Sequence, residues 1–302
     1  MGRMPVPQEL AAGVPFEPTL FLMLFLQQFS GELLKLFARK RTYIGFGAFL
    51  GVELLMLFLL NLERVRKGIA RVIEEAGYPA EAYLSGLTLA FLVLLSSVFL
   101  LGSLYLALIA GDVVGKEVED GTLRMMLCRP VSRSRILLLK LGAVIVYSLV
   151  LTWFVAITAL ALGLLHSGAG GLFVFAPMEK VFALYEFWPG LIRYTIGVGL
   201  LSVSLLTIPA VGFFLSCLDM KPAAATIGTL SFLFMDSILK NIPFFESLKP
   251  WFITSHMATW VHVFEYWIPW ERMAEDYAWL FALNATLVVL AHAVFQRRDF
   301  KS

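Results

Sequence analysis

The chain has 302 residues, of which 59% are hydrophobic and 15% are charged. Soluble domains carry nearer to a quarter charged residues, so this composition indicates that lipid surrounds most of the folded chain. The net charge of +2 gives no indication of nucleic-acid binding, and two cysteines, Cys128 and Cys217, are too few for a disulfide framework. Residues 1–17 lack the apolar core of a cleavable signal peptide and are predicted to be a flexible N-terminus.

Six apolar stretches approach the length needed to cross a bilayer, because about 20 residues of α-helix span a hydrocarbon core of about 30 Å. They cover residues 43–62, 87–110, 141–165, 191–216, 223–240 and 277–295. The sequence therefore predicts an all-α membrane protein with about six transmembrane helices in a single domain over residues 18–300.

The distribution of basic residues predicts the orientation, because Lys and Arg near span ends collect on the cytoplasmic side. Most of the 24 Lys and Arg residues fall in segments that share a side with both termini, whereas a basic cluster at 64–71 opposes the trend. We therefore expect a multi-pass protein of the inner membrane with both termini in the cytoplasm.

Three further segments flank the predicted spans. Residues 18–41 are predicted to form an interfacial helix, with Leu33, Leu34 and Phe37 on an apolar face and a basic face toward anionic lipid. Residues 63–84 are predicted to be helical on the outer side. Residues 241–276 are rich in Trp, Phe and Tyr, which predicts one or two short helices that enter the outer leaflet and return.

The loop at 111–140 is predicted to contain a short amphipathic helix, whose ends are marked by particular residue types. Gly121 interrupts a charged stretch, and the hydroxyl of Thr122 is suited to capping the next turn. An apolar face follows, formed by Leu123, Met126 and Leu127, and Pro130 ends the element because it lacks an amide hydrogen. Ser132 or Ser134 is expected to cap the helix after it. Such a protrusion suits docking to a soluble partner.

This loop also carries a family resemblance. The run Glu117-x-Glu119-x-Gly121-Thr122-Leu123, followed by Arg129-Pro130-Val131-Ser132-Arg133, Ile136 and Lys140, resembles the signature of type-2 ABC transporter permeases. The plan of spans resembles that family over about residues 30–300, including Arg297-Arg298-Asp299 at the end. The alternative interpretation is that 117–140 is an ordinary charged cytoplasmic loop, which would need no partner.

The resemblance implies a permease subunit, in most cases an exporter, that pairs with a second permease chain as a homo- or heterodimer. It also implies that each chain docks one cytoplasmic ATPase subunit, which would hold ATP and Mg, so that this chain carries no cofactor. The residues implied in ATPase coupling are Glu32, Lys35, Arg39, Glu117, Glu119, Gly121, Thr122, Leu123, Arg129, Pro130 and Arg133. The chain itself contains no phosphate-binding GxxxxGK[ST] motif, and its four histidines lack metal-ligand spacing.

Two acidic residues fall inside predicted spans, where a carboxylate costs roughly 2.5–3.5 kcal/mol on insertion scales. Glu53 lies near the middle of the first span and Asp236 in the outer half of the fifth. One interpretation is that they line a polar substrate path. The other is structural, with Glu53 hydrogen-bonded to a neighbouring Ser or Thr.

Small residues also form a GxxxG pattern at Gly47 and Gly51 in the first span, which is suited to close packing within the chain or between two chains.

A different class of function stays open beside the permease interpretation. The chain could be a polytopic membrane enzyme, or an assembly subunit that anchors a cytoplasmic partner. An enzyme would need titratable residues that converge on adjacent spans, whereas Glu53, Asp236 and His292 are predicted at different depths. A neighbouring gene that encodes an ATPase would favour the permease.

Overall fold

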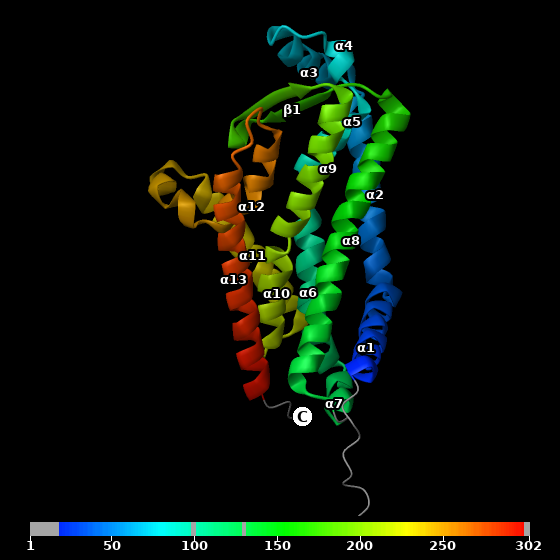
Figure 1. The fold of residues 1–302 in the computed structure, drawn as a ribbon, viewed down its shortest axis with the longest axis vertical. Coiled ribbons are helices and arrows are strands. Elements are labelled where there is room, and N and C mark those ends of the chain that lie inside the picture. The colour runs from blue at the N-terminus through cyan, green and yellow to red at the C-terminus, as the bar shows by residue number, and fades with distance from the viewer. Residues whose placement is uncertain (1–17, 98–100, 129–130, 299–302) are drawn as a thin grey trace, which may run out of the picture.

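The computed structural model describes residues 18–97, 101–128 and 131–298 as an elongated helical bundle (Figure 1). Both described termini and α7 lie at one end, here called the terminal end, and the β-hairpin lies at the other, the hairpin end. The elements are α1 (Pro18–Ala38), α2 (Lys40–Leu60), α3 (Glu63–Glu75), α4 (Ala80–Tyr83), α5 (Gly86–Ser97), α6 (Ser103–Glu119), α7 (Thr122–Leu127), α8 (Arg133–Ser167), β1 (Leu172–Ala176), η3 (Pro177–Glu179), β2 (Val181–Tyr185), α9 (Phe187–Ser204), α10 (Thr207–Cys217), α11 (Pro222–Lys240), η4 (Pro243–Trp251), α12 (Ile253–Met257), η5 (Ala258–Phe264) and α13 (Trp270–Arg297).

Within the described residues, five helical segments are long and apolar enough to cross a membrane. They are α2, α8, the nearly continuous pair α9 and α10, α11 and α13. Each overlaps a predicted span, which confirms a mainly helical membrane protein. The predicted span 87–110 is not one described helix: α5 has 12 residues, α6 begins at Ser103, and residues 98–100 lie outside the described chain.

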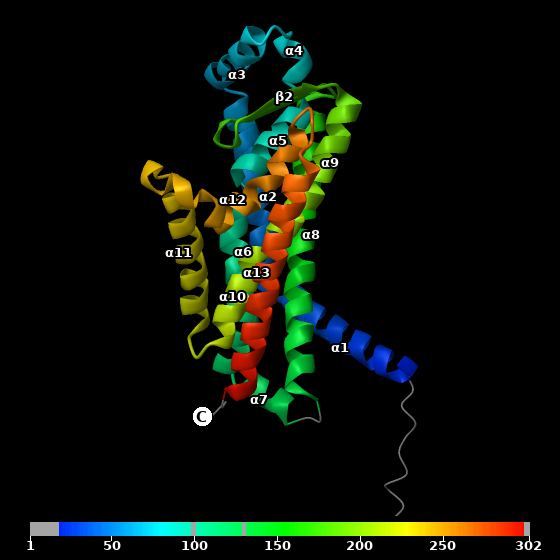
Figure 2. The same ribbon diagram turned by 60° about the vertical axis from the view of Figure 1, so that its left-hand side comes forward.

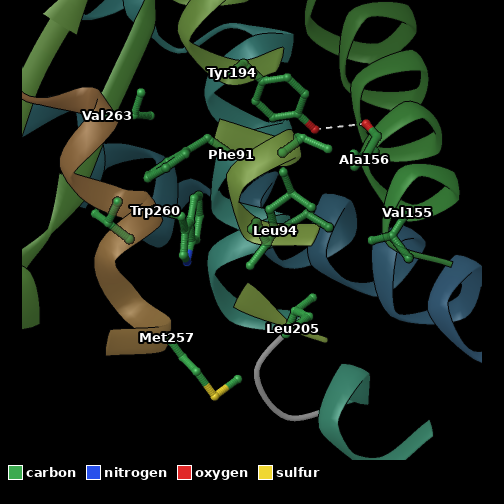
Figure 3. Packing of buried hydrophobic residues seen from close by; sticks show 14 of the residues in the cluster. Phe91, Leu94, Val155, Ala156, Tyr194, Leu205, Met257, Trp260 and Val263 are labelled. Atoms are coloured by element: carbon green, nitrogen blue, oxygen red, sulfur yellow. Dashed lines mark hydrogen bonds between the residues drawn. The ribbon is translucent and has the colours of Figure 1, made fainter. Parts of the chain in front are cut away.

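The core lies around α5, α8 and α9 (Figure 3). Phe91 of α5 packs edge-on against Phe264 with the ring centroids 4.9 Å apart, and Tyr194 of α9 donates a hydrogen bond to the carbonyl of Ala156 at 2.8 Å. At the hairpin end, Gly86 and Gly163 touch backbone to backbone, and a Cβ on Gly86 would lie 2.4 Å from the Gly163 carbonyl. Small residues therefore allow α5 and α8 to pack closely.

A two-stranded antiparallel hairpin, β1 and β2, was not predicted and departs from an all-α fold. Its strands pair Leu172 with Tyr185 through Ala176 with Val181. Ile73 of α3 packs with Phe173 and Leu184 of the hairpin in a small buried cluster, so the outer helix predicted at 63–84 covers the hairpin. The apolar run 172–176 is too short for periodicity alone to assign it to a strand.

The aromatic segment before α13 folds as three short helices, η4, α12 and η5, where one or two were predicted. Its aromatic residues divide into two groups: Trp260 and Phe264 are buried in the core, whereas Trp251 and Trp267 are exposed. Only part of this segment is therefore available to meet lipid or water.

Candidate functional site

The described residues that the resemblance implies in ATPase coupling lie together at the terminal end. Figure 2 shows α1 leaving the bundle at an angle to α8, and its location at a membrane interface stays a prediction. The turn into α2 is held by Thr42, whose hydroxyl donates to the carbonyl of Leu36 at 2.6 Å. Leu34 is largely exposed and Glu32 is 7% exposed, so Glu32 faces α6 and α8 instead of the lipid headgroups.

Four charged side chains from three helices form what we call the buried charge cluster: Glu32, Lys35, Glu117 and Lys140. Lys140 of α8 is 0% exposed, and its Nζ lies 3.2 Å from Glu32 Oε2 and 2.6 Å from Glu117 Oε2. The half-exposed Lys35 caps the cluster, 2.7 Å from Glu32 Oε1 and 3.9 Å from Glu117 Oε1. The cluster is electrically neutral and joins α1, α6 and α8.

The electrostatics of the cluster follow from its burial. Desolvation by itself would raise the pKa of Glu32, but the ammonium groups of Lys140 and Lys35 outweigh it and hold the pKa below its ordinary value of 4.5. Glu32 therefore stays ionised at neutral pH. Removing one member of such a buried set typically costs about 3–5 kcal/mol, because the remaining charge is left without a partner.

A second layer of ion pairs surrounds the cluster. Arg41, at the start of α2, lies 3.0 Å from the buried carboxylate of Asp112 on α6. Lys116 pairs with Glu119 at 2.9 Å and with Asp120 at 3.2 Å on the exposed end of α6. Of the predicted coupling residues, Glu119 is thus the one that presents a carboxylate at the surface.

The predicted short helix after Gly121 is present as α7. Gly121 has φ +71°, a left-handed conformation that glycine adopts without strain at the end of α6. Leu123 is buried and Met126 half-buried, as the predicted apolar face requires, whereas Met125 is 66% exposed. The expected cap by Thr122 is wrong: its hydroxyl donates to the Glu117 carbonyl at 3.3 Å.

Other residues singled out in the sequence also have defined positions. Ser132 accepts a hydrogen bond from the Arg135 amide at 3.3 Å and caps α8, as predicted. Arg133 donates to the carbonyls of Gln296 and Arg298, both at 3.0 Å, and so caps the C-terminal end of α13. Arg39 is half-buried before α2. Arg129 and Pro130 lie outside the described residues.

The helix that carries Glu117 packs closely against α11. A Cβ on Gly111 of α6 would lie 2.5 Å from Thr226 Oγ1, and one on Gly115 would lie 3.2 Å from the ring of Pro222. On its other side, α6 meets α10, where a Cβ on Gly212 would lie 2.8 Å from that of Ala110. Displacement of the α6 end therefore bears directly on α10 and α11.

The two acidic residues predicted inside spans have different partners. Glu53 is 0% exposed and accepts a hydrogen bond from Thr158 on α8 at 2.9 Å, the kind of partner that the structural interpretation requires. Asp236 on α11 accepts hydrogen bonds from the amides of Ile253 and Thr254 at 3.1 and 2.8 Å, and from the Thr254 hydroxyl at 2.6 Å. Asp236 therefore caps the start of α12 from a neighbouring helix.

Sequence reasoning missed three residues of the site. Lys140 was noted only as part of a motif, and Arg41 and Asp112 were not assigned a pairing. A signal was present for two of them: Lys140 interrupts the apolar run 136–144, and Asp112 follows the apolar run 104–110 after Gly111. A charge in that position needs a partner, but the sequence does not say which one.

The fold and the location of the site thus define a helical membrane protein with a charged junction at one end of its bundle. The chain belongs to the DUF2705 family, described as proteins of unknown function, whose family model matches residues 49–301. Over 72 residues it is 35% identical to the uncharacterized protein YhcI of Bacillus subtilis (strain 168). That match covers 24% of this chain and 23% of YhcI, so the chain spans about a quarter of the length of this curated relative.

Proposed function

We propose that this chain is the permease subunit of an ATP-driven transporter of the type-2 ABC class, and that the terminal end docks a cytoplasmic ATPase. In this proposal both termini lie in the cytoplasm of the inner membrane. A second permease chain completes the pathway, ATP and Mg bind to the ATPase, and the direction of transport is export.

The observation that carries the proposal is the buried charge cluster. Its ion pairs connect α1 and α6 to the first turns of α8. Because α7 directly follows α6, we expect α1, α7 and the start of α8 to move together. A force applied by a soluble partner at α7 would reach α10 and α11 through the glycine contacts of α6. An anchor without a coupling role would not need this direct connection.

The test is made on Glu119, because its carboxylate is exposed and its reversal leaves the buried charge cluster intact. The affinity-tagged chain is isolated from its native membranes, and co-purifying proteins and ATP hydrolysis are measured. We expect an ABC ATPase to co-purify with the wild-type chain, and Glu119→Lys to lower its yield and the ATPase activity several-fold.

The matched control is Glu75→Lys, which reverses an exposed carboxylate at the hairpin end and should leave both readouts unchanged. Absence of any nucleotide-binding protein from the wild-type preparation would contradict the proposal and favour the membrane enzyme or assembly subunit.

A further inference from the structure

A hollow of about 410 Å³ lies at the terminal end, next to the buried charge cluster and distinct from it. Three basic side chains line its wall: Arg41 of α2, Lys116 of α6, and Lys221, the residue before α11. Two acidic residues also line it, Asp112 and Glu119. The lining therefore has one more positive than negative charge.

The excess charge is located at Lys221. Asp112 is paired with Arg41 at 3.0 Å, and Glu119 with Lys116 at 2.9 Å. Among the described residues, no acidic side chain lies within ion-pairing distance of Lys221, which is exposed. The hollow thus offers one ammonium group, that of Lys221, without an acidic partner among the described residues. The other two cations already hold carboxylates, Arg41 that of Asp112 and Lys116 those of Glu119 and Asp120.

The hollow opens where charged residues give way to apolar ones. Both α2 and α11 begin at this level, and both are candidate membrane spans. Their first turns present exposed apolar side chains: Tyr43 and Ile44 are 63% and 60% exposed on α2, and Ile227 is 62% exposed on α11. An occupant with an anionic head and an apolar tail matches both surfaces.

We infer that this hollow binds the headgroup of an anionic phospholipid from the leaflet at the terminal end, with its acyl chains against α2 and α11. Basic pockets between transmembrane helices are suited to acidic headgroups, because the phosphate gains charge-assisted hydrogen bonds while the tails stay in lipid. The inference needs only the membrane location of the chain and is independent of the transport proposal. A soluble phosphate compound would use the cations and leave the apolar wall unfilled.

The test uses the full chain in neutral detergent, titrated with phosphatidylglycerol or with phosphatidylcholine of the same acyl chains, with bound lipids counted by native mass spectrometry. We expect one phosphatidylglycerol to bind more tightly than phosphatidylcholine. Loss of one lysine charge near a headgroup weakens binding about fivefold, so Lys221→Gln should show that decrease and Lys221→Arg should not. The control Lys249→Gln removes a charge from the exposed surface of η4 and should have no effect.

Equal affinity of the wild-type chain for the two lipids would overturn the inference, as would equal losses in Lys221→Gln and Lys249→Gln. Glycerol phosphate distinguishes a lipid from a soluble anion: displacement of phosphatidylglycerol at similar concentration would assign the hollow to free phosphate and overturn the lipid assignment. Thermal melting in phosphatidylcholine checks folding, and we expect Lys221→Gln to melt like the wild type because its side chain is exposed.

Discussion

Lys140 has no exposed surface and lies between two carboxylates that come from two other helices. Lys140→Met should therefore leave Glu32 and Glu117 buried with only the half-exposed Lys35 to balance them. We expect the free energy of unfolding to fall by about 3–5 kcal/mol, measured by denaturant unfolding in detergent.

The matched control for this prediction is Lys116→Met, next to Glu117 on α6. It removes the exposed ion pairs with Glu119 and Asp120 and should change stability little. The triple variant Glu32→Gln, Glu117→Gln, Lys140→Met should recover part of the loss, since no unpaired charge remains buried. A Lys140→Met protein as stable as the wild type would show that the cluster does not hold these helices together.

Acid should weaken the same junction. Because the folded-state pKa of Glu32 lies below its ordinary value of 4.5, ionised Glu32 contributes stability above pH 4.5. That contribution is lost as the pH falls through the folded-state pKa. Glu32→Gln should therefore flatten the decline in unfolding free energy as the pH falls below 4.5, and an unchanged pH dependence would contradict the ion-pair assignment.

At the scale of the elements, the close contact of α6 with α11 gives a test of packing. Gly111→Ala would place a Cβ 2.5 Å from Thr226 Oγ1 and 3.1 Å from the Pro222 carbonyl, so one helix must shift. We expect a loss of about 1–3 kcal/mol in unfolding free energy. Gly51→Ala on α2 is the control, since a Cβ there meets nothing within 4 Å, and it should not destabilise. Equal effects of the two variants would rule out a tight α6–α11 contact.

Much of this element order could be predicted from the sequence. Long apolar runs and local caps depend on neighbouring residues, so most spans, the α7 helix and the cap at Ser132 were predicted correctly. The buried charge cluster could not be predicted, because Glu32 and Lys140 meet through tertiary packing across 108 positions. The hairpin was missed because its apolar strands have five residues each.

At the scale of the whole molecule, the account requires that the terminal and hairpin ends lie on opposite sides of the membrane. Cys128, beside α7, is exposed and Cys217 is buried, so an impermeant maleimide should label the native chain at Cys128 only. Cys128→Ser with Glu74→Cys on α3 moves the reactive thiol to the hairpin end. The native chain should label in inside-out vesicles and the variant in intact cells. Labelling of both from one side would contradict the topology.

Docking of an ATPase at the terminal end can be detected by crosslinking in native membranes. A photoreactive maleimide on Cys128 places the crosslinker beside the exposed face of α7, and Cys128→Ser is the matched control. We expect a light-dependent adduct between this chain and an ABC ATPase, identified by mass spectrometry and missing in the control. Adducts that contain no nucleotide-binding protein, while the labelled chain remains folded, would contradict the account.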